Sequence, residues 1–227
     1  NSAFMGPEGY AQVFTMHGTI MMFLFAIPLI EGFAVYLLPK LLGTRDLAYP
    51  RLTAYGFWCY ILGGTMLIFA LLAGIAPDGG WFMYPPLTSS AASPGINTDF
   101  WLLGITFVEI SAICAAVEII VSILRYRAPG MALSKMPIFA WYMLVVAVMI
   151  LTGFPPMILG SILLELERAF GLPFFQMEAG GDSLLWQQLF WLFGPRPALY
   201  RRFCRSCRAP PFWDMVGLWR LRLRLEC

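Results

Sequence analysis

Charged residues are scarce in this sequence. Only 12% of its 227 residues are Asp, Glu, Lys or Arg, whereas 59% are hydrophobic and the mean hydropathy is +0.73. A soluble domain has about twice that charged fraction. A chain of this size cannot bury so much apolar surface inside its own core. The scarcity of charge therefore excludes an ordinary soluble domain and indicates an integral membrane protein.

Long apolar runs divide the chain. A helix needs about 20 predominantly apolar residues to cross the hydrocarbon core of a bilayer. We therefore expect an all-α fold, a polytopic membrane bundle of four complete transmembrane helices plus a broken fifth. The four runs are Ala11–Leu38, Tyr55–Ala76, Phe100–Leu124 and Pro137–Leu164, and the fifth begins at Leu184 and breaks at Pro195.

Basic residues are missing from the loop 77–99, and Arg168 alone follows the fourth run, beside several acidic residues. The other two loops are basic: Lys40, Arg45 and Arg51 follow the first run, and Arg125, Arg127 and Lys135 follow the third. Inner loops of membrane proteins carry an excess of Lys and Arg. The alternation predicts that the first span begins on the outer side of the membrane.

Histidine is nearly absent, because His17 is the one histidine in the chain. It lies near the outer end of the first span, where an unsatisfied polar group costs about 2–4 kcal/mol. It is either hydrogen-bonded to a neighbouring helix or a metal or haem ligand, since neutral imidazole is a good donor to iron. Gly18 allows the close approach of a flat macrocycle or of another helix. Spacing alone leaves these alternatives open.

Cysteine is also sparse, with five in the chain. Cys59 and Cys114 lie inside predicted spans, where a buried thiol behaves as a small apolar group. Cys204 and Cys207 form a CxxC, a pattern that can hold a metal or a redox pair. Because a second pair is missing, we expect no function for it.

Four sequence blocks resemble subunit I of the haem-copper terminal oxidases. They are FTMHGTIMMFLFAIP in the first span, RDLAYPRLTAYGFW on the inner side, GGWFMYPPL in the outer loop and FFQMEAGGDSLLWQQLFWLFG before the fifth span. They occur in the family's order and extend over residues 10–194. The resemblance implies a cytochrome c oxidase: electrons pass from cytochrome c through a low-spin haem to a haem-copper centre, where O2 is reduced to water and protons are translocated.

The resemblance also implies residue roles, partners and a location. His17 matches an axial ligand of the low-spin haem iron, and Trp81 matches a tryptophan near the haem propionates. Asp46 matches the aspartate at the inner mouth of the D proton pathway. The structural alternatives are an anchoring Trp at the membrane interface and an ordinary solvated loop acid. Partners would be cytochrome c, other oxidase subunits and membrane lipid, in a bacterial plasma membrane.

The proton pathway departs from the family pattern. The family has asparagines near its entrance, and the matching positions here are Val35 and Ala54. The neighbouring hydroxyls of Tyr36 and Thr53 are candidates to hold water instead. This puts the pathway in doubt.

Three acids lie within predicted spans where the family pattern has neutral residues: Glu31, Glu109 and Glu118. A carboxyl group at that depth should face protein, water or a partner. Each is either a buried structural hydrogen-bonding group or a member of a proton relay.

The largest departure begins at Gly194. The family continues with G-H-P-E-V-Y, but this chain has Arg196 in place of the copper-binding histidine and Ala198 in place of the glutamate. Eight of the fifteen basic residues and three of the five cysteines follow Gly194. We therefore expect residues 1–194 to be an oxidase fragment and residues 195–227 to be an Arg-rich tail produced by a frameshift. The opening NSAFMGPEG also suggests a piece of a longer protein.

The scarcity of histidine limits the expected chemistry. One histidine cannot ligate a haem iron on both sides or build a copper site, so the copper ligands are absent and we expect this chain alone to be inactive. A quinol oxidase subunit I is one alternative. A b-type haem membrane anchor, completed by His17 of a second copy, is another. The third is a non-functional translation product without a cofactor.

Overall fold

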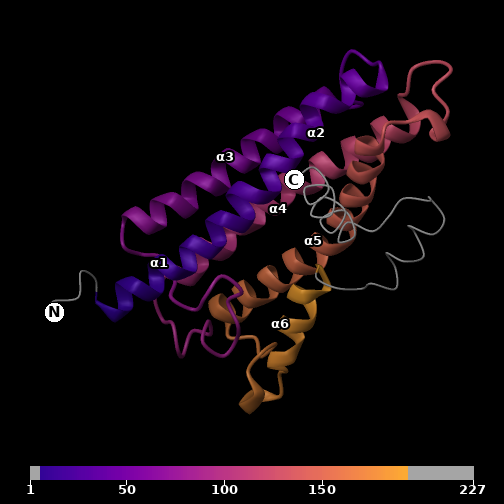
Figure 1. Cartoon of the computed structure of the whole chain (residues 1–227). Coiled ribbons are helices and arrows are strands. Elements are labelled where there is room, and N and C mark those ends of the chain that lie inside the picture. Colours follow the sequence, from indigo (N-terminus) through magenta and orange to yellow (C-terminus); the bar gives the residue numbers. More distant parts are fainter. Residues whose placement is uncertain (1–5, 194–227) are drawn as a thin grey trace, which may run out of the picture.

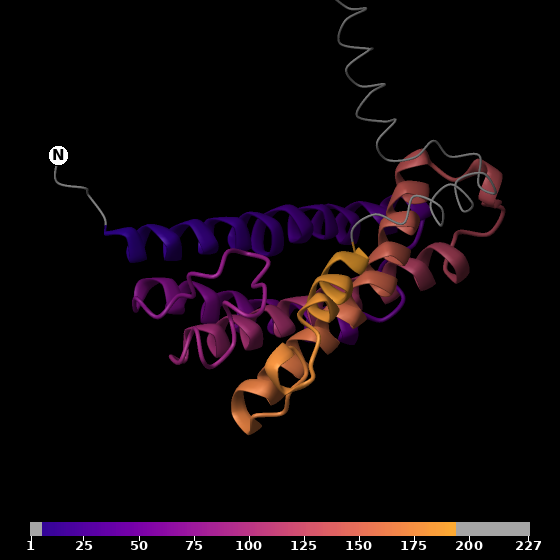
Figure 2. The same cartoon turned by 90° about the horizontal axis from the view of Figure 1, so that it is seen from below.

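The first span is one long helix with an irregular middle. The computed structural model describes residues 6–193. Helix α1 (Pro7–Thr19) continues through a π-helical stretch (Ile20–Ala26) into α2 (Ile27–Leu42), and the three form an unbroken rod (Figures 1 and 2). Pro7 stands in the first turn, where a missing N–H is harmless, and Gly43 ends the rod with a φ of 70° that favours glycine.

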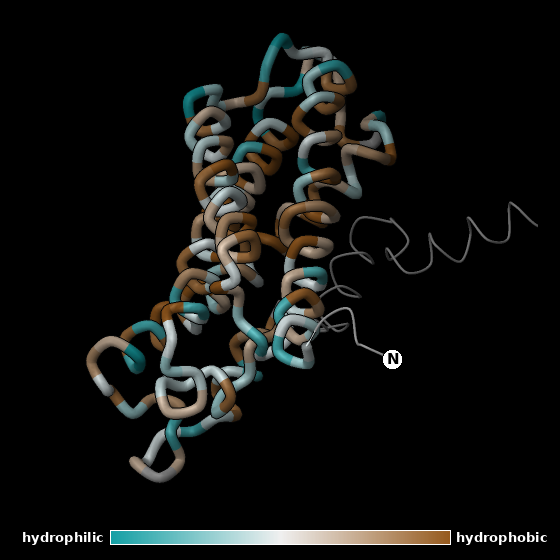
Figure 3. Tube along the Cα trace, turned by 90° about the vertical axis from the view of Figure 1, so that its left-hand side faces the viewer, coloured by the Kyte–Doolittle hydropathy of each residue, from teal (hydrophilic) through white to brown (hydrophobic). Residues whose placement is uncertain are grey.

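Four helices follow: α3 (Pro50–Leu72), α4 (Asn97–Arg125), α5 (Ile138–Phe170) and α6 (Ser183–Phe190). Short 3-10 turns occupy Leu133–Lys135, Met177–Ala179 and Trp191–Phe193. The rod 7–42 and helices α3, α4 and α5 are long and apolar enough to cross a membrane, which confirms the all-α fold and the four expected spans. Hydrophobic residues dominate the middle of these helices, and hydrophilic ones gather at the two ends of the bundle (Figure 3).

The boundaries of the four membrane helices differ by one to six residues from those of the predicted apolar runs. Helix α5 continues six residues past Leu164, so Arg168 lies in its last turn and not in a loop. Gly171, with a φ of 68°, ends it. The fifth span begins at Ser183, one residue before the predicted start, and its α-helical part ends at Phe190. The predicted break at Pro195, Arg196, Ala198 and the whole tail lie outside the described residues.

The rod, α3 and α4 run side by side, whereas α5 crosses them at an angle and α6 packs along α5 (Figures 1 and 2). Glycine brings α3 and α4 close together. A Cβ atom added to Gly63 would lie 2.4 Å from the carbonyl oxygen of Gly104, so a side chain here would force the two helix backbones apart. Small residues at a helix crossing are the usual means of close packing in membranes.

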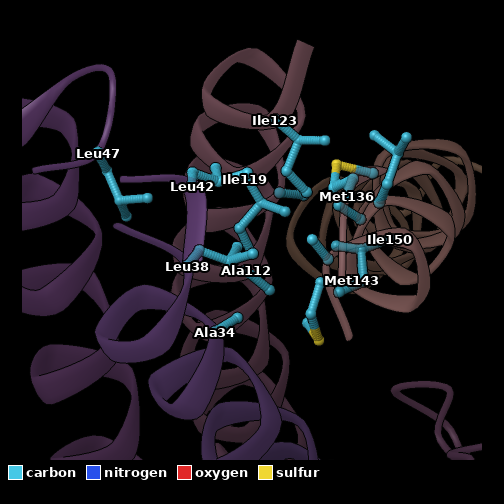
Figure 4. Close-up of a cluster of buried hydrophobic side chains, with 14 of the residues drawn as sticks. Ala34, Leu38, Leu42, Leu47, Ala112, Ile119, Ile123, Met136, Met143 and Ile150 are labelled. Carbon is cyan, nitrogen blue, oxygen red and sulfur yellow. The ribbon is translucent and has the colours of Figure 1, made fainter. Parts of the chain in front are cut away.

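A buried apolar cluster joins α2, α4 and α5 on the inner half of the bundle (Figure 4). Its labelled members are Ala34, Leu38, Leu42, Leu47, Ala112, Ile119, Ile123, Met136, Met143 and Ile150. A second cluster, around Trp101, Trp186 and Phe175, joins the outer halves of the helices to the outer loop. One cluster packs the helices together in the inner half of the bundle, and the other packs them together in the outer half.

Hydrogen bonds connect the loops at each end. At one end the amide of Ala128 donates to the carbonyl of Leu42 at 3.0 Å, and the amide of Ala48 donates to Ser122 Oγ at 2.9 Å. At the opposite end the amide of Gly80 donates to Thr15 Oγ1 at 2.9 Å. The two basic loops therefore share one end of the bundle and the loop 77–99 lies at the other, as the charge alternation predicts.

Candidate functional site

His17 lies on the exposed face of α1. Thr15, Met16 and Thr19 beside it are buried, whereas the His17 side chain points away from the bundle. Thr19 Oγ1 donates to the Thr15 carbonyl and accepts from Trp101 Nε1, both at 2.9 Å. These bonds fix the rotation of α1, because its threonine face is tied to the bundle. The imidazole is therefore held on the opposite face, free of the described residues.

The face that carries His17 is otherwise apolar. It presents a stripe of exposed large side chains at helical spacing, namely Tyr10, Phe14, Met21 and Phe25. A face of this kind is suited to lipid, to another helix or to a large flat apolar group. An imidazole nitrogen in its middle is the one strong metal donor on the stripe.

Trp81 fills the space beside Gly18. A Cβ atom added to Gly18 would lie 2.9 Å from Trp81 Cβ, so this glycine admits the tryptophan of the outer loop to the helix. The sequence left open whether Gly18 makes room for a flat macrocycle or for another part of the protein. In the structure, the Trp81 side chain occupies this space. The indole stands among other rings, with its centroid 5.6 Å from that of Phe190 and 6.3 Å from that of Phe23. Trp81 thus lies next to the backbone of His17.

Arg168 organises the outer loop, which sequence reasoning did not foresee. Its guanidinium donates to both Asp99 carboxylate oxygens, at 2.5 and 3.2 Å. It also donates to three loop carbonyls, those of Thr88, Ser93 and Gly95, at 2.7 to 2.9 Å. All five bonds come from a side chain that is 5% exposed. The planar, many-donor guanidinium is the group suited to this task.

Asp46 lies in the exposed loop between α2 and α3, at the inner end of the bundle. Its Oδ1 accepts from the amide of Leu47 at 2.8 Å, a turn-forming bond that leaves the other oxygen toward solvent. The carboxylate is exposed to solvent at the end of the bundle that carries the basic loops. The geometry is also that of an ordinary loop aspartate.

A cavity of about 270 Å³ lies between α2, α3 and α4, above the Asp46 loop. Val35 and Thr53 line it, whereas Ala54 is exposed and does not. Tyr36 also points away, with Lys40 Nζ 3.4 Å from the centroid of its ring. Of the two hydroxyls named as candidates to hold water, the one at the cavity is therefore that of Thr53.

The three acids of the membrane-spanning helices lie in different surroundings. Glu118 lines the cavity and accepts from Thr53 Oγ1, which lies 2.8 Å from each carboxylate oxygen. Glu31 also lines the cavity, but its Oε1 has no hydrogen-bond partner among the described residues. Glu109 is completely buried, and neither of its carboxyl oxygens has a described partner. It is not one of the lining residues.

Two further polar groups around the cavity escaped the sequence analysis. Tyr60 donates its hydroxyl to the carbonyl of Leu24 at 2.8 Å. The residue four positions after Leu24 is Pro28, which has no N–H to donate to this carbonyl. Ser111 lines the cavity seven residues before Glu118, a spacing that places both on one face of α4. In the sequence, the signal for the Tyr60 bond was the position of Pro28 after Leu24. The signal for Ser111 was its i, i+7 spacing from Glu118.

The family comparison agrees with this architecture. The model of the family described as Cytochrome C and Quinol oxidase polypeptide I matches residues 1–197. The chain belongs to this family. Members of this family bind haems and copper.

Named relatives of this oxidase family come from several bacteria. The chain is 43% identical over 214 residues to a probable cytochrome c oxidase subunit 1-alpha of Streptomyces coelicolor, covering 94% of this chain and 36% of the relative. It is 41% identical over 215 residues to cytochrome c oxidase subunit 1 of Corynebacterium glutamicum, covering 94% and 35%. It is 39% identical over 199 residues to that of Bacillus subtilis, covering 88% and 32%. The chain thus spans about a third of the length of these relatives.

The donors present fit part of the family's cofactor set. His17 offers one imidazole on an accessible, otherwise apolar face, which suits one axial position of a haem iron. In residues 6–193, no group of three or more His, Cys, Asp or Glu side chains lies close enough together to hold a metal ion. The described part of the chain therefore offers one imidazole whose surroundings suit a haem iron, and no described cluster of three metal-binding side chains.

Proposed function

We propose that this chain is a segment of a cytochrome c oxidase subunit I that contributes one axial ligand, His17, to the low-spin haem. The observation that carries the proposal is the position of the chain's one histidine. It is exposed on an apolar stripe of α1, at the outer half of the span, while the threonines on either side are locked into the bundle. When bound, the haem supplies the electron-transfer chemistry.

Trp81 is proposed to help hold the haem at its propionate end. Its ring is fixed beside His17 by the glycine contact and by four neighbouring aromatic rings. Its indole N–H has no acceptor within residues 6–193, and an indole donates readily to a carboxylate. The role proposed for Trp81 is therefore a hydrogen bond to an acidic group outside the bundle.

Asp46 is proposed to collect protons on the inner side. It stands in the exposed basic loop below the cavity, and one of its carboxylate oxygens remains available to solvent. In the complete oxidase, these protons would serve the reduction of O2 to water and proton translocation. The electron donor is proposed to be cytochrome c, as the relatives' names indicate. Quinol is the second candidate, because the family description covers both classes.

The haem proposal is tested by expressing the full chain in membranes with haem supplied and measuring the haem it retains after purification. We expect His17→Ala to lower haem affinity about 100-fold, because it removes the iron donor. Trp81→Phe should lower affinity less and leave the absorption spectrum of the iron unchanged. Equal haem retention by the wild-type chain and His17→Ala would contradict the proposal, as would a chain that retains none.

Oxygen consumption is a separate readout. We expect none from this chain alone, with or without haem. The oxidase that contains the whole subunit should consume O2 with reduced cytochrome c as donor. Activity with quinol in its place would transfer the proposal to the quinol-oxidising branch.

A further inference from the structure

The cavity between α2, α3 and α4 contains two carboxyl groups at different depths. Glu118 lies seven residues before the inner end of α4, and Glu31 lies eleven residues before the inner end of α2. At 1.5 Å per residue these positions are about 10 Å and about 16 Å from the inner ends of their helices. Both side chains line the same cavity. The two acids therefore occupy successive depths of one space that begins near the Asp46 loop.

The two carboxyl groups differ in how they are satisfied. Glu118 receives the Thr53 hydroxyl at 2.8 Å, at the inner part of the cavity. Glu31 is 8% exposed, and its Oε1 has no partner within the described residues. A buried carboxyl oxygen without a partner is costly in a mostly apolar surrounding. Its position on the lining indicates that it is satisfied by something inside the cavity.

Water is the occupant that fits the polar groups on the wall. The cavity volume is large enough for several water molecules, and each water needs two to four polar partners, as a rule of thumb about three. Carboxyl oxygens of Glu31 and Glu118 and hydroxyls of Thr53 and Ser111 supply such partners. No Lys or Arg lies among the described lining residues, so no fixed positive charge repels a proton.

We propose that Glu118 and Glu31 are two successive proton-binding stations in this cavity. The Glu118 carboxylate takes a proton from a hydronium ion at the inner end, which leaves a water molecule, and becomes a carboxylic acid. The proton then passes through cavity water to Oε1 of the Glu31 carboxylate, so Glu31 becomes the carboxylic acid and Glu118 returns to the carboxylate. The relay moves protons alone and needs no oxidant or reductant. It rests on the proposed function for its direction, which is proton uptake from the inner side.

The surroundings of the stations contain few other titratable groups. Tyr60 lines the cavity, but its hydroxyl is engaged with the Leu24 carbonyl. Cys114 on α4 and Asp46 at the inner loop are the other titratable neighbours of Glu118. Neither is a lining residue, so the two glutamates and the engaged tyrosine are the titratable groups on the wall described here.

Glu109 provides a control within the same helix. It lies nine residues before Glu118, and at about 100° per residue this places it on the opposite side of α4. It is fully buried and away from the cavity lining. A carboxyl group that is merely buried should behave like Glu109, whereas a relay member should exchange protons through the cavity.

The test uses the full chain in lipid nanodiscs. Infrared difference spectroscopy after transfer to D2O follows each protonated carboxyl band, assigned with Glu31→Gln, Glu118→Gln and Glu109→Gln. Gln keeps the shape of each side chain, and at position 118 it can still accept from Thr53. We expect the Glu31 band to exchange much faster than the Glu109 band. Glu118→Gln should slow the Glu31 exchange about 100-fold, because a positioned proton-transfer group is lost.

Two outcomes would overturn the relay. Exchange of Glu31 at the slow rate of Glu109 would mean a dry cavity, for instance one filled by a lipid chain between Gly32 and Phe57. An unchanged Glu31 rate in Glu118→Gln would mean that protons reach it by another route. Neither readout involves haem, so retention of haem by His17 can succeed while the relay fails, and the reverse.

Discussion

The Arg168 side chain at the outer loop and the Glu31 side chain in the cavity differ in how far their buried polar atoms are paired. At the outer end, the buried Arg168 guanidinium has five hydrogen bonds, and the indole N–H of the buried Trp186 donates to the Phe82 carbonyl at 2.9 Å. In the cavity, Glu31 Oε1 faces space without a described partner. Both regions belong to the same small bundle. Carboxyl oxygens without a described partner also occur outside the cavity, on Glu109 and at Glu167 Oε1. What sets Glu31 apart is that its carboxyl group lines the cavity.

A saturated buried group and an unsaturated one have different consequences for stability. A buried group whose hydrogen bonds are all made stabilises one arrangement of the chain around it, because its removal leaves several partners unpaired. A buried polar group without a hydrogen-bond partner lowers stability until it binds a ligand, a water molecule or a proton. The outer loop is therefore expected to act as a scaffold for the His17 and Trp81 face, and the cavity as a place of exchange.

Removal of the Arg168 guanidinium should have the largest effect on stability. Arg168→Met keeps the length of the side chain but leaves the Asp99 carboxylate and three loop carbonyls without their donor. We expect a loss of about 3 kcal/mol in the free energy of unfolding, measured by SDS titration of the full chain in detergent micelles. Chymotrypsin should also cut the loop 77–96 faster. The stability of Arg168→Lys should lie between those of the wild type and Arg168→Met. If Arg168→Met were as stable as the wild type, the hydrogen bonds of Arg168 would not stabilise the outer loop.

The Trp186 hydrogen bond should have a smaller effect. Trp186→Phe keeps an aromatic ring next to Phe175 and Phe190 but leaves the partly buried Phe82 carbonyl without its indole donor. We expect a loss of about 1–3 kcal/mol in the same unfolding measurement. Trp191→Phe is the matched control, because Trp191 is exposed and its partner, the Tyr84 hydroxyl, can bind water instead. Equal losses in both variants would show that ring size, and not the hydrogen bond, matters here.

The four spans were predictable because each depends on local composition, and so was the placement of the two basic loops at one end of the bundle. Which side of the membrane that end faces stays a prediction. Apolar length sets a transmembrane helix. Lys40 and Arg51 lie in the terminal turns of α2 and α3, and Arg127 lies just beyond α4, so these basic residues gather at one end of the bundle. The end of α5 was not predictable in the same way. Arg168 and its acidic neighbours resemble a solvated loop in sequence, but their bonds to the outer loop depend on contacts about 70 residues apart in the chain.

The candidate site was predictable only in part. The uniqueness of His17 in an apolar span made it a candidate, but its exposure depends on Thr15 and Thr19 being tied to Gly80 and Trp101. The sequence placed three acids in the spans without ranking them. Which of them share a cavity depends on how α2, α3 and α4 pack, and that is a property of the tertiary structure. The division of the chain at Gly194 stays a prediction.

The smallest expected effect has the opposite sign. Glu31→Leu replaces an unpartnered buried carboxyl group with an apolar side chain of similar size, so we expect the free energy of unfolding to rise by about 1 kcal/mol. Glu118→Leu is the matched control on the other wall of the cavity. It removes the acceptor of the Thr53 hydroxyl, so it should give no such gain. If Glu31→Leu lowered stability as an arginine or tryptophan variant of the outer loop does, Glu31 would be a satisfied structural group. A gain in stability together with loss of the fast-exchanging carboxyl band would mean that the chain retains this acid at the expense of its own stability, as expected for a group kept for proton transfer.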